Sequence, residues 1–432
     1  MPAKGKKKGK GKGKGKKKKK LNGMGETPGD IVKRLYRIYL NNCDVKSTMF
    51  CQSLKTFMKN CLEDNKLIVK FILEPVADFQ DPVLSNVRLE PLVMSLRQER
   101  YKYIKELHIW DIPLKHEDVA TLALMLDKGV YPITRLELID CDVGAYAVER
   151  LMKCIPMTII SILSFDYNEF GDEGVRGICK GLKNNRLLLS LSLCYCDLGV
   201  ESGSLLGDIV STTALREIYL NGNNLEAEGT IELVKLAADH AEMESYERAE
   251  TARLKAEEEA QALLMEKERG RLPTAMSSSE PVPKPDSAKS SKAGGLGKKK
   301  KKKGKKKKKS KAPPEPPPVG PWIHKLHLAD NGIDSYGRGS TYAPVIITRL
   351  FRQLIQHSSC LQELDIDDNL IGDLGGREIM EALNQRKEAG HPSMKMSVTH
   401  RMNSETFASI MKLGAGLKKK GKKKGKKKKK KK

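Results

Sequence analysis

Four groups of residues have the type and spacing of reactive or ligand-binding sites. Residues 416–423 match most of a phosphate-binding glycine loop, but Lys423 stands where Ser or Thr would hold Mg²⁺, and no strand precedes the match. Residues 365–369 begin like an EF-hand calcium loop, but Leu370 replaces the glycine of its sharp turn and the closing Glu is absent. We therefore predict neither a nucleotide site nor a calcium site at these positions.

The third and fourth groups are two pairs of residues whose side chains can bind a metal ion. Cys194 and Cys196 lie two residues apart, and His324 and His327 lie at the start of an apolar alternation. A zinc centre needs three or four converging ligands, and the nine cysteines include no C-x-x-C pair. No Ser/His/Asp or Cys/His set is recognisable, so we predict no catalytic residue, no metal site, no cofactor and no enzymatic activity. The odd number of cysteines favours free thiols in a reducing, intracellular setting.

The elements that must position any binding residues are repeats of one short motif. The pattern L-x-L-x-x-N/C begins at Leu136, Leu163 and Leu191, and with Ile in first place at Ile218. The Asn/Cys positions of these copies are 27, 28 and 27 residues apart, and weaker copies begin at 107, 326 and 364. Alternate side chains of such a strand face the core, while the Asn or Cys turns inward and bonds buried backbone groups. The predicted inward ladder is Cys141, Asn168, Cys196, Asn223, Asn331 and Asn369.

Each strand of the motif is followed by the signals of a helix. Residues 170–174 contain two glycines and lead into apolar residues at helical spacing over 175–182. A period near 28 residues leaves room for a full helix, and one such unit cannot bury both its strand face and its helix face. We therefore predict an α/β solenoid, a curved horseshoe with parallel strands on the concave face and helices on the convex face.

The period and the Cys/Asn alternation resemble the ribonuclease-inhibitor subclass of leucine-rich repeat proteins over residues 100–236 and 322–400. Residues 168–174 and 185–193 also make the layout similar to leucine-rich repeat proteins of the axoneme. This resemblance implies a protein-binding scaffold in the cytoplasm, at the axoneme of a cilium or flagellum or on the cytoskeleton. GTPase-activating regulators use the same repeat subclass and are the alternative, although their acidic C-terminal tail is replaced here by lysines.

The repeats are flanked and interrupted by segments of different composition. Thr27-Pro28 is a helix-start signal, and an open solenoid end needs a cap. Residues 230–269 lack Gly and Pro and interleave basic residues with Glu, which predicts a long, solvated, projecting helix. The predicted division is a disordered Lys/Gly-rich tail (1–27), a helical cap with a degenerate repeat (28–100), repeats (101–236), the extended charged helix (237–272), a disordered Lys/Pro/Ser-rich insert (273–320), C-terminal repeats with a cap (321–412) and a second disordered Lys/Gly-rich tail (413–432).

The net charge of +26 is unevenly distributed. Three lysine tracts, at 4–20, 298–311 and 418–432, hold 12, 12 and 13 lysines and no acidic residue. The remaining sequence has 43 basic and 54 acidic residues, a net charge of −11. The tracts lack the aromatic and Arg residues that base stacking and base readout require. We expect them to bind acidic polyanions, either the acidic tails of tubulin or, in a nuclear or nucleolar alternative, nucleic acid. No apolar run is long enough to predict a transmembrane segment.

The side chains that point outward from the predicted strands are acidic and aromatic. One interpretation is an ordinary solvated strand face. A second is a groove for a basic segment of a partner protein, with aromatic anchors and carboxylates that fix the register. A third is that the chain's own lysine tracts occupy the groove. The candidate partner-binding residues are His108, Trp110, Asp111, Glu137, Asp140, Asp166, Tyr167, Tyr195, Tyr219, Asp330, Asp365, Asp367 and Asp368.

Overall fold

The structure is a computed structural model that describes residues 26–76, 86–269, 318–334 and 342–416. All three lysine tracts lie outside the described residues. So do residues 1–25 and 417–432 of the two predicted tails and most of the insert predicted at 273–320. The predictions of disorder for these segments therefore stay predictions.

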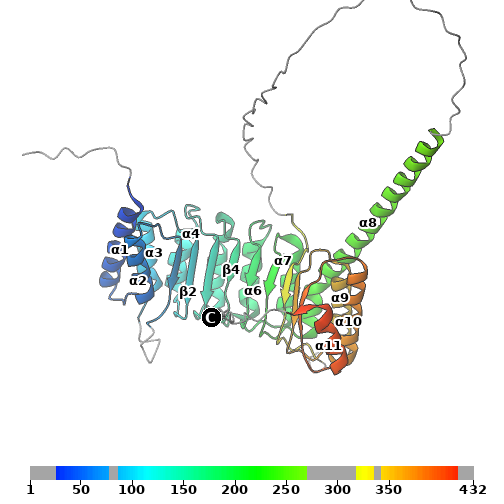
Figure 1. Ribbon diagram of the computed structural model, residues 1–432. Coiled ribbons are helices and arrows are strands. Elements are labelled where there is room, and N and C mark those ends of the chain that lie inside the picture. Colours follow the sequence, from blue (N-terminus) through cyan, green and yellow to red (C-terminus); the bar gives the residue numbers. More distant parts are fainter. Residues whose placement is uncertain (1–25, 77–85, 270–317, 335–341, 417–432) are drawn as a thin grey trace, which may run out of the picture.

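Within the described residues, ten strands form one open sheet whose spatial order follows the sequence order (Figure 1). Every neighbouring pair is parallel. Parallel strands need a crossover between them, and the repeat helices supply it. The strands are β1 (Lys70–Leu73), β2 (Glu106–Trp110), β3 (Arg135–Ile139), β4 (Ile162–Ser164), β5 (Ser190–Ser192), β6 (Glu217–Tyr219), β7 (Lys325–His327), β8 (Glu363–Ile366), β9 (Lys395–Val398) and β10 (Ala415–Gly416).

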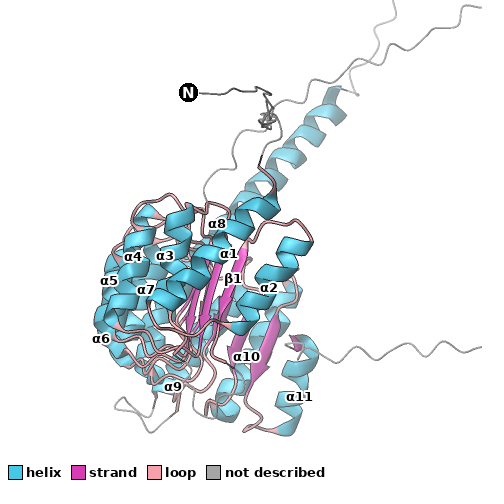
Figure 2. Ribbon diagram, turned by 90° about the vertical axis from the view of Figure 1, so that its left-hand side faces the viewer, coloured by secondary structure: helices cyan, strands magenta, loops and turns pink. Residues whose placement is uncertain are grey.

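The helices line one side of the sheet and leave the other side open (Figures 1 and 2). Within the described ranges, none of them combines the length and the apolar character that a bilayer crossing requires. The helices are α1 (Pro28–Val45), α2 (Gln52–Glu63), α3 (Leu89–Glu99), α4 (His116–Leu126), α5 (Ala145–Met152), the 3-10 helix η2 (Ile155–Met157), α6 (Gly171–Leu182), α7 (Val200–Thr212), α8 (Glu226–Arg269), α9 (Ala343–His357), α10 (Gly372–Glu388) and α11 (Ser404–Leu413).

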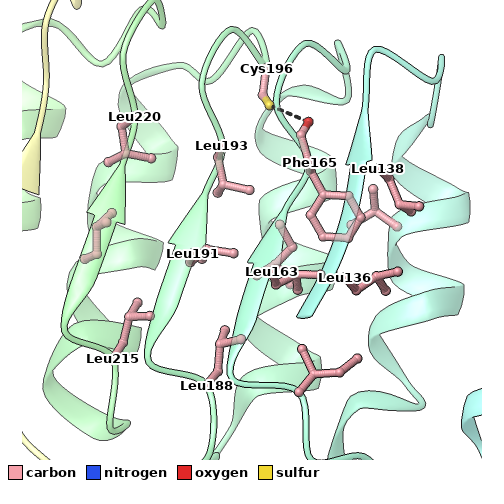
Figure 3. Packing of buried hydrophobic residues seen from close by; sticks show 14 of the residues in the cluster. Leu136, Leu138, Leu163, Phe165, Leu188, Leu191, Leu193, Cys196, Leu215 and Leu220 are labelled. Carbon is pink, nitrogen blue, oxygen red and sulfur yellow. Dashed lines mark hydrogen bonds between the residues drawn. The ribbon is translucent and has the colours of Figure 1, made fainter. Parts of the chain in front are cut away.

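The core between sheet and helices consists of stacked apolar side chains (Figure 3). Leu136, Leu163 and Leu191 are backbone partners on adjacent strands, and all three are fully buried. Burial of one such side chain stabilises the fold by roughly 2 kcal/mol, so the shared apolar position favours this register over a one-residue slip. The same column continues through Phe71 and Leu107 on one side and Ile218, Leu326, Leu364 and Met396 on the other.

The predicted α/β leucine-rich repeat solenoid is confirmed. The sheet extends beyond the seven motif copies, with β1 before them and β9 and β10 after them. β1 precedes the first predicted repeat. Phe71 and Leu73 are buried as an L-x-L pair would be. No Asn or Cys follows them at the motif position, so the repeat pattern does not predict this strand. β10 lies inside the range 413–432 that was predicted as a tail, and it pairs with β9.

The predicted long helix is α8, which has 44 residues and a length of about 66 Å. Its first part packs between α7 and α9, and residues 251–267 are all exposed where the helix projects from the solenoid (Figure 1). The packed part extends to Arg248, beyond the predicted boundary at 236. The reason is that the Arg248 guanidinium donates a 2.7 Å hydrogen bond to the backbone oxygen of His357 at the end of α9.

The solenoid continues across the long insert because both ends of the insert are anchored. The Trp322 indole N–H donates to Glu244 on α8 at 3.1 Å, and the Arg216 guanidinium lies 5.4 Å from the Trp322 ring. Buried Arg216 also donates to the backbone oxygens of Gly320 and Pro318. β6 and β7, about 100 residues apart in sequence, therefore pair like any other neighbours.

The inward Asn side chains join consecutive repeats. Asn168 is buried, and its Oδ1 accepts hydrogen bonds from the backbone N–H groups of Cys141 (3.1 Å) and Val143 (2.9 Å) of the preceding repeat. Its Nδ2 donates to the backbone oxygens of Leu138 (2.8 Å) and Phe165 (2.7 Å). One amide thus bonds to four buried backbone groups.

The inward Cys side chains make fewer bonds than the Asn side chains. The Cys196 thiol donates to the backbone oxygen of Phe165 at 3.3 Å (Figure 3), and the Cys141 thiol donates to that of Ile109 at 3.4 Å. Burial raises the pKa of Cys141 to about 12, so this thiol stays protonated and remains a donor. Asn223 bonds to Cys196 as Asn168 does to Cys141, so each Asn repeat is joined tightly to the Cys repeat before it.

We predict that Asn168→Ala lowers the free energy of unfolding by about 3 kcal/mol or more, because four buried backbone groups each lose a hydrogen bond. The measurement is urea unfolding followed by circular dichroism. Asn224→Ala is the matched control, because this exposed Asn makes one side-chain bond of 3.3 Å to Asp197. Its cost should stay within about 0.5 kcal/mol. Equal effects of the two substitutions would contradict the role assigned to Asn168.

Candidate functional site

The candidate site is the face of the sheet that the helices leave open, which we call the strand face. The structure divides the predicted binding residues into three classes of exposure. His108 and Glu137 are buried. Trp110, Asp166, Tyr219, Asp365 and Asp367 are half-buried. Asp111, Asp140, Tyr167, Tyr195, Asp330 and Asp368 are exposed.

His108 and Glu137 point away from the core but contact each other instead of solvent. They are 2% and 5% exposed, and Nδ1 of His108 lies 2.5 Å from Oε2 of Glu137 on the next strand. The Trp110 indole N–H donates to the same oxygen at 3.1 Å, and Arg135 donates to Oε1 at 2.6 Å. These residues therefore form hydrogen bonds between adjacent strands. The prediction that His108 and Glu137 face a partner is wrong because both side chains are buried in these contacts.

The electrostatics of this cluster follow from its contacts. Burial alone would raise the pKa of Glu137, but the hydrogen bonds and charges of His108 and Arg135 outweigh burial and lower it from 4.5 to about 2. The carboxylate is therefore ionised at neutral pH, and its charge is neutralised within the cluster.

The half-buried carboxylates hold neighbouring strands together. Oδ1 of Asp166 accepts from the Ser192 hydroxyl at 2.6 Å and from the Cys194 backbone N–H at 2.9 Å. Asp365 lies 3.6 Å from Nδ1 of His327, a ring nitrogen too far away for a hydrogen bond. Burial lowers the pKa of His327 and raises that of Asp365. These half-buried side chains therefore contact neighbouring repeats and expose little of their charge to a partner.

The exposed residues share one position in successive repeats, directly before the ladder position. This position has a positive φ in every repeat from β2 to β8, between 53° and 71°. It lies at the carboxyl end of each strand, so its residues follow one edge of the strand face. We call this row the acidic–aromatic edge; it consists of Asp111, Asp140, Tyr167, Tyr195, Gly222, Asp330 and Asp368.

Two tyrosines form the centre of the acidic–aromatic edge. The rings of Tyr167 and Tyr195 are stacked with centroids 4.7 Å apart and planes 8° apart, and they remain 53% and 43% exposed. Gly222 follows with φ +71°, and a Cβ added there would lie 2.1 Å from the Tyr195 ring. Gly222 therefore lets Tyr195 lie across the next repeat. Sequence reasoning left Gly222 out, although its motif position equals that of Tyr195.

The carboxylates on both sides of the tyrosines are close enough to affect the pKa of their neighbours. Burial and the charge of Asp140 raise the pKa of Asp111. Burial, Tyr167 and the charge of Asp330 raise the pKa of Tyr195. The row contains no Lys or Arg, so the edge concentrates negative charge around an exposed aromatic pair.

The opposite edge of the strand face is electrically balanced. At the amino ends of the strands, Lys325 pairs with Glu217 at 2.8 Å, and Lys395 pairs with Glu363 on the adjacent strand. Among the residues that the structure describes, charge on the strand face is thus in ion pairs along one edge, whereas the carboxylates of the acidic–aromatic edge form no ion pair. Among the described residues, no three His, Cys, Asp or Glu side chains are arranged to hold a metal ion.

Comparison with known proteins supports the repeat assignment. A family profile described as "Leucine Rich repeat" matches residues 357–380, which contain β8 and Asn369. NACHT, LRR and PYD domains-containing protein 4B of Mus musculus is 28% identical over 214 residues, or 47% of this chain and 23% of the relative. The human proteins 13 and 5 of the same name series are 25% and 24% identical, covering 45% and 46% of this chain. The chain thus spans less than a quarter of the length of these relatives.

We predict that the stability contributed by Glu137 depends on pH. Its folded pKa is lowered, so its contribution is complete above pH 4.5 and is lost as the pH falls toward 2. Glu137→Gln should therefore reduce the free energy of unfolding by about 3 kcal/mol near neutral pH and by progressively less in acid. Urea unfolding of both chains across this range measures the difference. A difference that does not change with pH would contradict the assigned ion pairs.

Proposed function

We propose that this chain is a non-enzymatic protein-binding scaffold whose acidic–aromatic edge binds an extended basic segment of a partner protein. The observation that carries the proposal is a row of exposed Asp and Tyr that is interrupted only by Gly222 and contains no basic residue. It lies on a face whose other edge is ion-paired. The Cys/Asn alternation of the ladder also supports the finer assignment to the ribonuclease-inhibitor subclass.

The chemistry of the edge favours Lys and Arg side chains. A cation can lie against the exposed ring of Tyr195, where cation–π attraction contributes about 0.5–2 kcal/mol. Beyond Gly222, Asp330 and Asp368 follow β7 and β8 and supply carboxylates. Neighbouring strands are about 4.8 Å apart, so seven positions span roughly 30 Å, or about nine residues of extended chain. The backbone of the edge is fixed by the ladder, so binding requires little ordering of the scaffold.

We predict that Tyr195→Ala weakens binding of a nine-residue Lys/Arg-rich peptide by roughly threefold to tenfold, because the aromatic contact is lost. Asp330→Asn with Asp368→Asn should weaken it further and make it less sensitive to salt. Fluorescence anisotropy with a labelled peptide measures both effects.

Tyr146→Ala is the matched aromatic control, because Tyr146 is 68% exposed on helix α5, away from the strand face. Glu257→Gln with Glu258→Gln is the charge control on the projecting part of α8. Peptide affinity that falls equally in the controls would contradict binding at the acidic–aromatic edge.

We also propose that the lysine tracts bind acidic polyanions, with tubulin tails as the target and the axoneme or cytoskeleton as the location. The support is their composition, 37 lysines without an acidic residue, together with the sequence resemblance. Such contacts release counterions, so binding should fall steeply with salt.

Co-sedimentation with microtubules tests this second proposal. We expect binding at low salt that is lost when the acidic tubulin tails are removed by protease. Binding that persists without the tails, or binding to nucleic acid alone at the same salt, would contradict it and favour the nuclear alternative.

A further inference from the structure

A hollow of about 530 Å³ lies at the amino-terminal edge of the sheet, opposite the acidic–aromatic edge. Its lining residues come from the second half of helix α3 and from the connections α3–β2 and α4–β3, which belong to consecutive repeats. They include four cations and no carboxylate: Arg97, Arg100, Lys102 and Lys128, together with Met94, Gln98, Val130 and Tyr131. We call this site the basic hollow.

The backbone that carries these cations is fixed. Helix α3 ends in a left-handed residue, Arg100, at φ 53°, a position where Gly is more usual. The next residue, Tyr101, is buried and donates its hydroxyl to the backbone oxygen of Ile68 at 2.8 Å. Tyr101 N–H also bonds to the backbone oxygen of Leu96 at 2.9 Å. Arg97, Arg100 and Lys102 therefore stand around an anchored turn.

The charge of the basic hollow is not neutralised by the described residues. The structure shows no ion pair between any of its four cations and a described carboxylate. Two acidic residues lie next to it in sequence, Glu99 and Asp127, but neither lines the hollow, and Glu99 is bound by Arg34 at 2.6 Å. Burial raises the pKa of Tyr131, and the charges of Arg97 and Arg100 oppose this rise, so both cations lie near its hydroxyl. The protonated hydroxyl is a further donor toward the same space.

We infer that the basic hollow binds a compact ligand carrying two or more phosphate groups. Guanidinium groups bind phosphate oxygens through paired hydrogen bonds, lysines add point charge, and the hydroxyl of Tyr131 adds a neutral donor. Four cations around one cavity repel one another, and a polyphosphate relieves that repulsion. Outside the lysine tracts the sequence has a net negative charge, so the positive charge of this site is opposite in sign to its surroundings. The ligand is either a free small molecule or the phosphorylated headgroup of a lipid.

The test is hydrogen–deuterium exchange on the full chain, which reports each segment separately and so distinguishes the hollow from the lysine tracts. The probes are inorganic tripolyphosphate and, in a separate arm, phosphatidylcholine vesicles containing phosphatidylinositol bisphosphate. We expect segments 97–104 and 127–134 to become protected. Protection by tripolyphosphate identifies the free-molecule source, and protection by vesicles alone identifies the headgroup.

Charge reversal at the site provides the variant arm. Arg97→Glu with Lys128→Glu should weaken protection of both segments by about tenfold or more. Arg349→Glu with Arg377→Glu makes the same charge change at exposed positions on α9 and α10 and should leave protection unchanged. Arg97→Gln with Lys128→Gln replaces the first pair if charge reversal lowers the unfolding temperature.

Three outcomes would overturn the inference. Protection confined to the lysine tracts would show that the hollow binds no phosphate. Equal loss in the two charge-reversed chains would show that net charge, and not the site, attracts the probe. Equal protection by a polyglutamate peptide would show that the hollow accepts any acidic chain and does not select phosphate.

Discussion

The solenoid depends on the hydrogen bonds that inward-facing Asn side chains make to buried backbone groups at the ends of the strands. These groups need hydrogen-bond partners within the protein, because water does not reach them. The Asn168 side chain bonds to four buried backbone groups at one such place, and Asn223 and Asn369 repeat the arrangement. Because the Asn carbonyl bonds to the preceding repeat, the same interaction that satisfies one strand end also fixes the distance to its neighbour.

This ladder determines where the binding chemistry lies. An inward residue at a fixed position requires the residue before it to turn, and that residue takes a positive φ in every repeat from β2 to β8. Its side chain then lies at the carboxyl end of the strand, in line with those of neighbouring repeats. Asp, Tyr and Gly occupy this strained position, so the constraint that closes the core also produces the acidic–aromatic edge. The anchored insert keeps the row continuous between Gly222 and Asp330.

The fold could be predicted from the sequence far better than the candidate site. A repeated Leu and Asn/Cys spacing predicts strands, helices and inward faces, and it failed at β1, where the Asn/Cys signal is missing. The same alternation predicts which side chains point away from the core, but it does not predict which of them contact one another. His108 and Glu137 bond across strands 29 residues apart. The basic hollow likewise combines segments of two repeats, whose proximity only the folded chain reveals.

The central claim is that basic segments bind to the acidic–aromatic edge and not to exposed carboxylates in general. The most direct measurement is zero-length carbodiimide cross-linking of an isotope-labelled Lys-rich peptide to the full chain, with the joined carboxylates mapped by mass spectrometry. The account predicts cross-links concentrated on Asp140, Asp330 and Asp368, and competition from the chain's own lysine tracts would appear as unlabelled cross-links at these positions. Cross-links spread evenly over exposed carboxylates, including the glutamates of the projecting part of α8, would contradict it.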